Sequence, residues 1–139
     1  SLAWAAEMTR RRPFADIHEV MAAADEVWAD ISVDDKLEAF RAHPKIGAAV
    51  APSAGWASRE QSGMNTATDE LRRAMADGNR EYESRFGFIY IVCATGKTAE
   101  QMLELLQRRL NNDRDTELAE ASEQQRQIMR LRLGKWLAP

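Results

Sequence analysis

The sequence has little of what several classes of protein require. Cys93 is the single cysteine in 139 residues, which excludes an internal disulfide and a cysteine-based metal cage. No HxxxH or HxxE pattern joins the two histidines, His18 and His43, so the usual set of metal ligands is missing. Walker and dinucleotide fingerprints are missing too, and ATGKT at 94–98 lacks the first glycine of a phosphate loop. We therefore expect no metal site and no phosphate-binding loop.

Long apolar runs and a strong excess of one charge are also lacking. The 19 basic and 22 acidic residues give a formal net charge of −3. The one dense basic cluster, Arg10 to Arg12, has no aromatic residues interleaved with it, which argues against nucleic acid as a partner. No apolar run approaches the length that spans a membrane. The 45% hydrophobic and 29% charged residues are typical of a soluble globular protein.

Targeting signals are not visible. Ser1 to Arg12 has no long apolar core followed by a cleavage site, and Leu137 to Pro139 do not form a peroxisomal address. We therefore expect a cytoplasmic protein, which the single cysteine also suits. The chain does not begin with methionine, which suggests that it was trimmed and that an N-terminal piece preceded it.

What the sequence does have is helical periodicity, with inward-facing residues at spacings of three and four. Ser32 with Asp35, and Thr98 with Gln101, mark two helix starts, and Thr116 is expected to cap the last helix. We expect one compact all-α domain over 1–139, of about six or more helices. The inward-facing residues are Ile17, Val20, Met21, Ala24, Val27, Trp28, Ile31, Leu37, Phe40, Leu71, Ala74, Met75, Gly78, Tyr82, Met102, Leu105, Leu106, Arg109, Leu110, Leu118, Ala121, Gln125, Ile128, Arg132 and Trp136.

The run FGFIYIVCA at 86–94 does not fit this pattern. Its aromatic and β-branched residues favour a buried strand by propensity. No second run of this kind is available to pair with it, and an unpaired strand would leave its backbone groups without partners. A buried helix is therefore an equal alternative. Cys93, inside this run, is expected to be inert packing.

Arg132 and Glu60 are charged residues in unusual places. Arg132 lies on the apolar stripe of the last helix, where an unpaired guanidinium would cost several kcal/mol. Its head could reach solvent, meet a structural carboxylate, or hold a substrate carboxylate with two hydrogen bonds. Glu60, in WASREQSG at 56–63, could be a carboxylate that the dipole of the following helix favours, or part of a site.

His43 precedes Pro44 and a Gly-rich loop, where no packing role accounts for a histidine. Pro44 is expected to end the preceding helix, because it disfavours helical geometry at His43. The ordinary pKa of histidine, near 6.5, allows it to carry or release a proton at neutral pH. An exposed, idle histidine is the alternative. His18, near the start of a helix, is expected to be a surface residue.

Four stretches in order, AHPKIG (42–47), REQSG (59–63), FGFIYIVCATGKT (86–98) and IMRLRL (128–133), resemble the signatures of one family. That family is 2-oxo-4-hydroxy-4-carboxy-5-ureidoimidazoline (OHCU) decarboxylase, and the resemblance extends from RPF at 12–14 to the final LRL. It implies an all-α homodimeric enzyme that needs no cofactor. The implied reaction converts OHCU, the small-molecule substrate, to (S)-allantoin and carbon dioxide in urate breakdown.

The resemblance also assigns roles to residues. His43 matches the catalytic histidine, as proton donor or acid-base group, Glu60 its glutamate partner, and Arg132 the arginine that anchors the substrate. The residues expected to line the substrate site, partly through backbone groups, are Pro44, Ala57, Ser58, Arg59, Gln61, Tyr90, Ile91, Val92, Cys93 and Ala94.

Three features depart from the family pattern. Ala57 stands where many members have serine, although Ser58 is adjacent. Phe88, Ile89 and Tyr90 stand where members often have Phe-Pro-Phe, so the pocket wall is expected to gain a phenol. Members usually carry a further helix before the segment that matches Ser1 to Ala6.

Two other functions fit the same residues. The first is a non-catalytic helical interaction domain in which Arg132 and Glu60 form a buried ion pair and His43 is idle. The second is a related lyase or hydrolase that acts on another intermediate of purine-ring breakdown.

Overall fold

A computed structural model of the protein describes residues 1–47, 60, 63–64 and 67–138, and within them it contains helices and no strand. The predicted all-α class is confirmed. The helices are α1 (Leu2–Arg10), α2 (Ile17–Asp30), α3 (Val33–Arg41), α5 (Asp69–Phe86), α6 (Ala99–Arg109) and α7 (Arg114–Trp136).

Short polar side chains determine where the helices begin. Ser32 caps α3 by accepting a hydrogen bond from the Asp35 backbone N–H, and Thr98 and Gln101 form the predicted capping box of α6. The prediction for the last helix was wrong, because Asp113 and not Thr116 is its cap. The Asp113 carboxylate accepts from the Thr116 backbone N–H at 2.7 Å, which places Thr116 inside the first turn.

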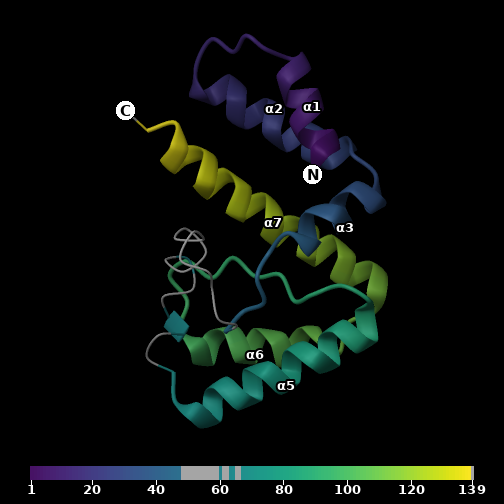
Figure 1. Ribbon diagram of the computed structural model, residues 1–139, viewed down its shortest axis with the longest axis vertical. Coiled ribbons are helices and arrows are strands. Elements are labelled where there is room, and N and C mark those ends of the chain that lie inside the picture. Colours follow the sequence, from purple (N-terminus) through teal and green to yellow (C-terminus); the bar gives the residue numbers. More distant parts are fainter. Residues whose placement is uncertain (48–59, 61–62, 65–66, 139) are drawn as a thin grey trace.

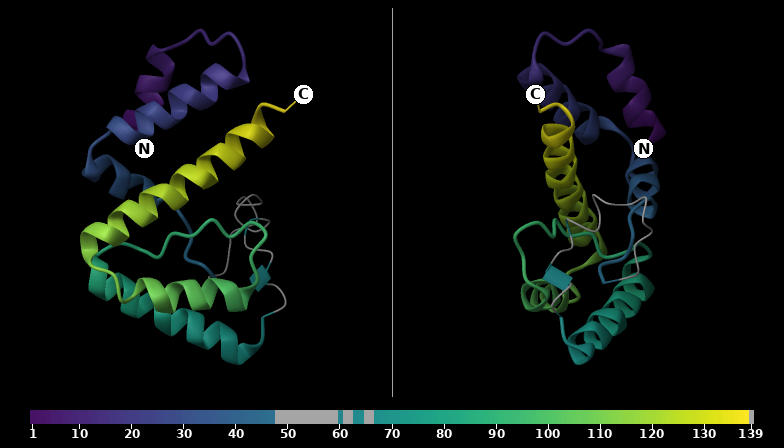
Figure 2. Two further views of the ribbon diagram at one scale, coloured as in Figure 1. Left: turned by 180° about the vertical axis from the view of Figure 1, so that it is seen from behind. Right: turned by 60° about the vertical axis from the view of Figure 1, so that its left-hand side comes forward.

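The helices form two groups joined by α7 (Figures 1 and 2). At one end α1 packs on α2, where the Trp4 indole N–H donates to the Ala24 carbonyl at 3.2 Å. At the other end α5 and α6 lie side by side and run in the same direction. The long helix α7 crosses between these groups, and the Trp28 indole of α2 donates to the Ser122 carbonyl of α7 at 3.0 Å.

The largest part of the core lies between α7 and the α5–α6 pair. Tyr82 contacts three other rings, with centroids 4.6 Å away for Phe86, 5.9 Å for Phe88 and 5.6 Å for Tyr90. A smaller cluster centred on Ala24 and Val27 is buried between α1, α2 and the end of α7. The predicted stripe of α7 ends earlier than expected, because Trp136 is 71% exposed.

The run at 86–94 is neither the strand nor the helix that the sequence suggested. Gly87, with a φ of +83°, ends α5, and the chain returns in an extended form between α7 and the α5–α6 pair (Figure 1). Side chains take the place of a partner strand. The Arg109 guanidinium donates to the Ile91 carbonyl at 2.7 Å, and the Gln124 side-chain oxygen accepts from the Cys93 N–H at 2.8 Å.

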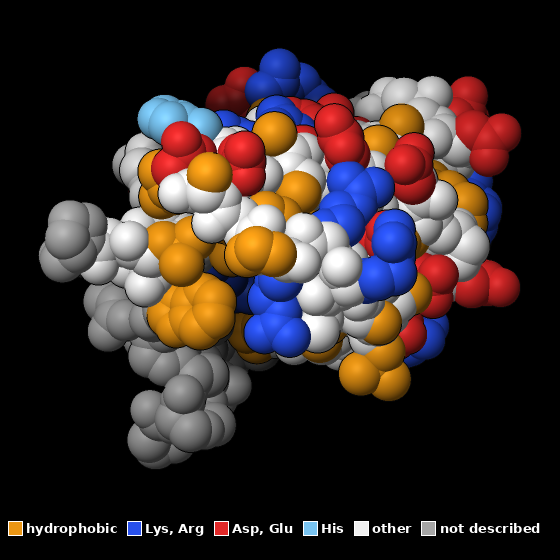
Figure 3. All heavy atoms as spheres, turned by 90° about the horizontal axis from the view of Figure 1, so that it is seen from above, with side chains coloured by type: hydrophobic (Ala, Val, Ile, Leu, Met, Phe, Trp, Pro, Cys, Tyr) orange, Lys and Arg blue, Asp and Glu red, His pale blue; other side chains and the backbone are white. Residues whose placement is uncertain are grey.

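The surface matches the nearly balanced composition. Lys and Arg side chains are interspersed with Asp and Glu over the face shown in Figure 3. None of the helices described here is both long enough and apolar enough to cross a membrane.

Candidate active site

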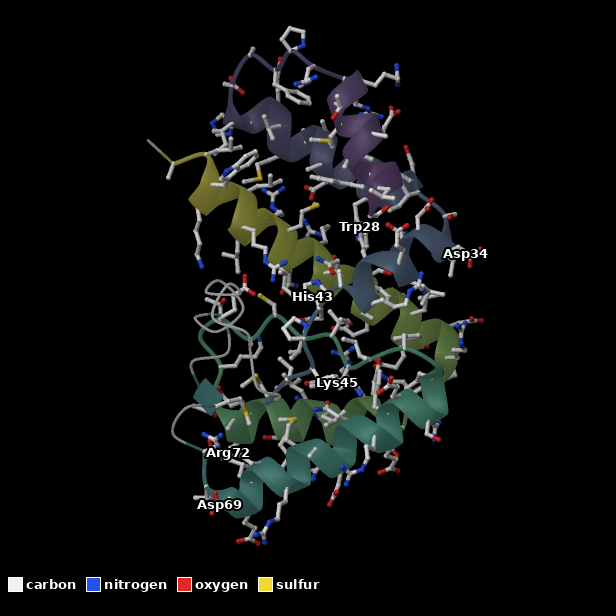
Figure 4. The ribbon with its side chains drawn as sticks, viewed as in Figure 1. Trp28, Asp34, His43, Lys45, Asp69 and Arg72 are labelled. Carbon is white, nitrogen blue, oxygen red and sulfur yellow. The ribbon has the colours of Figure 1, made fainter. Side chains whose placement is uncertain are left out.

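The segment that carries His43 is held from both sides. α3 ends at Arg41, and the His43 backbone N–H donates to the Phe40 carbonyl at 3.2 Å. Beyond Pro44, the Asn79 side chain of α5 donates to the Ile46 carbonyl at 2.9 Å, and Gly47 turns the chain with a φ of +81°. Figure 4 shows His43 beside α7, where the chain leaves α3 towards α5. His43 is therefore held in place and is not an exposed loop residue in this structure.

Glu60 and Arg132 form an ion pair across the same region. Arg132 Nε donates to Glu60 Oε1 at 2.9 Å and Nη2 donates to Oε2 at 3.0 Å. This is the two-bond geometry that arginine favours with carboxylates. The Glu60 side chain is 10% exposed and the Arg132 side chain 29% exposed, so the pair is only partly removed from water.

His43, Glu60 and Arg132 line one recess, together with Pro44. Its other walls are apolar, and its described lining is completed by Ile46, Tyr90, Ile91, Val92, Ala94 and Ile128. The recess is partly open to solvent. The three residues that stood out in the sequence therefore meet in one place.

The contacts within the recess pair these residues differently from the sequence expectation. We expected Glu60 to be the partner of His43, but Glu60 holds Arg132. The partner of His43 is Gln125 of α7, whose side-chain oxygen is hydrogen-bonded to His43 Nε2. Gln125 is 8% exposed.

Burial lowers the pKa of His43 below its ordinary value, and the positive charge of Arg132 lowers it further. The hydrogen bond to Gln125 and the charge of Glu60 act in the opposite direction but do not reverse the shift. His43 is therefore a neutral imidazole at neutral pH. In this state it can accept a proton before it donates one.

The wall formed by 90–94 agrees only in part with the sequence expectation. Tyr90, Ile91, Val92 and Ala94 line the recess, whereas Cys93 is absent from the described lining. The Cys93 N–H is bonded to Gln124, and its carbonyl accepts from Lys97 Nζ at 2.6 Å. The expected phenol is also turned away, because the Tyr90 hydroxyl donates to the Met102 carbonyl at 2.9 Å.

Four of the expected substrate-binding residues, Ala57, Ser58, Arg59 and Gln61, lie outside the described residues. Gln124, Gln125, Ile46 and Ile128 are site or supporting residues that the sequence reasoning did not assign. Gln125 could have been found, because it lies on the same apolar stripe as Arg132. Within the described part of the chain, no three His, Cys, Asp or Glu residues are grouped closely enough to hold a metal ion.

Comparison with known proteins shows the family of the chain. The sequence model of the OHCU decarboxylase family matches residues 1–134. The uric acid degradation bifunctional protein TTL of Arabidopsis thaliana is 35% identical over 138 residues, which are 95% of this chain but only 43% of the plant protein. The 2-oxo-4-hydroxy-4-carboxy-5-ureidoimidazoline decarboxylase of Amia calva is 32% identical, over 93% of this chain and 77% of the fish protein.

Solved structures show the same fold. A crystal structure of OHCU decarboxylase in the presence of (S)-allantoin superimposes with a TM-score of 0.88 and 32% identity, and covers 98% of this chain and 91% of the other. A crystal structure of (S)-allantoin synthase has a TM-score of 0.68 at 24% identity, over 93% of this chain and 40% of that protein. The chain is a member of the OHCU decarboxylase family.

Proposed function

We propose that this protein decarboxylates OHCU to (S)-allantoin and carbon dioxide. The observation that carries the proposal is the recess in which His43, Glu60 and Arg132 meet. It combines a neutral acid-base group, an anion-binding guanidinium and apolar walls in one small cavity. The names of the family relatives state the same reaction or its product.

OHCU can undergo this reaction without an external electron sink. Its carboxylate is bonded to a carbon next to a C=N bond. When the bond to the carboxylate breaks, its electron pair forms a C=C bond and the C=N pair moves to nitrogen, which takes up a proton. Loss of the hydroxyl proton then gives the carbonyl, and the other carbon is protonated. The proposed reaction therefore needs no cofactor, and the protein supplies orientation, charge stabilisation and proton transfer.

In this proposal His43 transfers the proton. A neutral imidazole removes the hydroxyl proton, and the resulting imidazolium delivers a proton to one face of the ring carbon. Delivery from one side would give a single enantiomer. Because burial favours the neutral form of His43, removal of the hydroxyl proton starts from the protonation state that already prevails.

Arg132 anchors the substrate, and Glu60 orients Arg132. Glu60 takes the Nε and Nη2 hydrogens that point towards it. Among the described residues Nη1 has no hydrogen-bond partner, so it can meet a substrate carboxylate or ring carbonyl. The same ion pair is what a non-catalytic interaction domain would contain, but such a domain has no need for a histidine and an apolar recess beside it.

The decisive experiment generates OHCU from urate in situ with urate oxidase and the hydrolase that follows it. Circular dichroism then reports whether added protein accelerates the formation of optically active allantoin above the spontaneous rate. A rate that does not depend on protein concentration would refute the proposal. Binding of allantoin, seen as a rise in Tm, would further separate an enzyme from an interaction domain.

The proposal extends to the setting of the reaction. We propose one domain over 1–139 that acts as a homodimer in the cytoplasm and binds no nucleic acid. The interspersed charges of Figure 3 agree with the last point, because nucleic-acid-binding faces are predominantly basic. Light scattering during size-exclusion chromatography tests the dimer, and a gel-shift assay with mixed DNA and RNA tests the absence of nucleic-acid binding.

A further inference from the structure

Gln125 is a side chain of α7 that contacts His43. It is buried, it follows Ala121 on the inner face of the helix, and its side-chain oxygen is hydrogen-bonded to His43 Nε2. Among the described residues no hydrogen bond engages the other ring nitrogen, Nδ1. Nε2 is therefore tied to the scaffold, and Nδ1 is the ring nitrogen left to bond to a ligand of the recess that His43 lines.

We propose that Gln125 is a positioning residue for the reaction, because it keeps the hydrogen of neutral His43 on Nε2 and leaves the Nδ1 lone pair to exchange protons with the substrate. The inference rests on the proposed function for its catalytic part. An amide oxygen can only accept a hydrogen bond, so the nitrogen that faces it must carry the hydrogen. A neutral imidazole has one hydrogen, so Nδ1 is then the basic nitrogen.

The choice of an amide has a chemical consequence. A carboxylate behind a catalytic histidine stabilises the imidazolium and raises its pKa, whereas an amide fixes the ring without adding a charge. The groups that face His43 are Gln125 and Arg132 from α7, and Glu60. Arg132 disfavours the imidazolium and Glu60 favours it, and their mutual ion pair offsets much of both effects. Gln125 therefore determines ring orientation while burial keeps the ring neutral.

The proposal is tested first without any activity measurement. A His18→Gln variant leaves His43 as the single histidine of this chain, and His18 is an exposed residue of α2. Long-range nitrogen–proton correlation spectra of the imidazole at neutral pH distinguish the two neutral tautomers. We expect the hydrogen on Nε2. A hydrogen on Nδ1 would overturn the proposal, because the amide would then present its NH2 group to the ring.

Two substitutions test the catalytic part. Gln125→Met removes the acceptor at similar size, and we expect kcat to fall on the order of 10-fold with little change in KM, because the ring loses its orientation. Gln125→Glu keeps an acceptor in place and adds a charge. It should restore much of kcat at high pH and move the acidic limb of the kcat profile to higher pH, because the imidazolium is stabilised.

Gln127→Met is the matched control, since Gln127 lies on the same helix and bonds to Glu123 outside the recess. If Gln125 is only structural, Gln125→Met should lower activity and Tm together, and Gln125→Glu should leave the acidic limb of the kcat profile at its original pH. Either result would contradict the proposal. Failure of the unsubstituted protein to turn over OHCU would overturn the proposed function. The imidazole spectrum would still decide whether Gln125 sets the tautomer.

Discussion

Two of the protein's arginine–glutamate pairs, Arg132–Glu60 and Arg109–Glu117, meet in similar geometry but in different surroundings. In the recess, Arg132 donates two hydrogen bonds to Glu60, and their side chains are 29% and 10% exposed. In the core, Arg109 and Glu117 are paired at 2.9 Å with side chains 7% and 0% exposed. The first pair lies at a pocket and the second far inside.

The two pairs differ most in how far their hydrogen-bonding capacity is used. Glu117 accepts from Arg109, from the Tyr82 hydroxyl, and from the Asn112 side chain at 3.1 Å. Arg109 also donates to the Ile91 carbonyl and stacks 4.9 Å from the Tyr90 ring centre. Glu60 and Arg132 have fewer partners among the described residues. A saturated buried pair supports structure, whereas a pair with spare donors beside a recess can bind a ligand.

The largest effect on activity is expected from His43. It lies beside the Arg132–Glu60 pair in the recess, and the buried Arg109–Glu117 pair has no histidine beside it among the described residues. His43→Asn should lower kcat by about 10²- to 10⁴-fold, the usual contribution of an acid-base group. The assay is allantoin formation from OHCU generated in situ, with His18→Asn as the control. A near-normal rate for His43→Asn would remove His43 from the mechanism.

Substitution of Glu117 and of Glu60 should lower the free energy of unfolding by different amounts. Glu117→Gln leaves the Arg109 charge buried without its counter-charge and should cost about 3–5 kcal/mol of unfolding free energy. Glu60→Gln should cost within about 1 kcal/mol, because solvent screens the partly exposed pair. Urea unfolding of both variants measures the difference. Equal losses would mean that the recess pair is as structural as the buried one.

Two of the arginines of α7, Arg132 and Arg130, allow a matched test of substrate binding. Arg132→Lys should raise KM about tenfold, because an ammonium group cannot reproduce the planar fork. Arg130→Lys, whose arginine bonds to Asp25 outside the recess at 2.5 Å, should leave KM unchanged. Steady-state kinetics of the pair decide the point, and an unchanged KM for Arg132→Lys would return Arg132 to a structural role.

The smallest expected effect is the dependence of stability on pH. Burial lowers the folded-state pKa of His43, so as pH falls the unfolded chain takes up this proton before the folded protein does. The stability that His43 contributes is therefore present above about pH 6.5 and lost as pH falls towards the folded-state pKa. Thermal unfolding should show the unsubstituted protein losing more stability than His43→Asn over this window. Parallel curves would contradict the neutral assignment.

Periodicity predicted most of the helices because their inner faces are apolar. Periodicity did not predict α1, because Met8 is the one buried residue of this helix and a single buried residue makes no repeating pattern. It also failed for the run at 86–94, because the groups that satisfy this backbone are side chains of Arg109 and Gln124. These partners are 18 and 31 residues away from the groups they bind, and no local pattern records them.

The site was predictable where a residue was chemically out of place. His43, Glu60 and Arg132 each conflicted with the local pattern, and they line one recess. The ion pair of Glu60 with Arg132, 72 residues apart, was expected only for the non-catalytic alternative, because the enzyme prediction paired Glu60 with His43. Gln125 was overlooked because an uncharged amide on an apolar stripe does not carry the cost of an unpaired buried charge.

The extended segment between α5 and α6 has a consequence for substrate range. Its backbone is held by Arg109 and Gln124 and not by a neighbouring strand. Ile91 and Val92 line the recess, and at 2% and 4% exposed they are also members of the main core. A substitution there that makes room for a larger ring substituent therefore also removes core packing, so that substrate range and stability should change together.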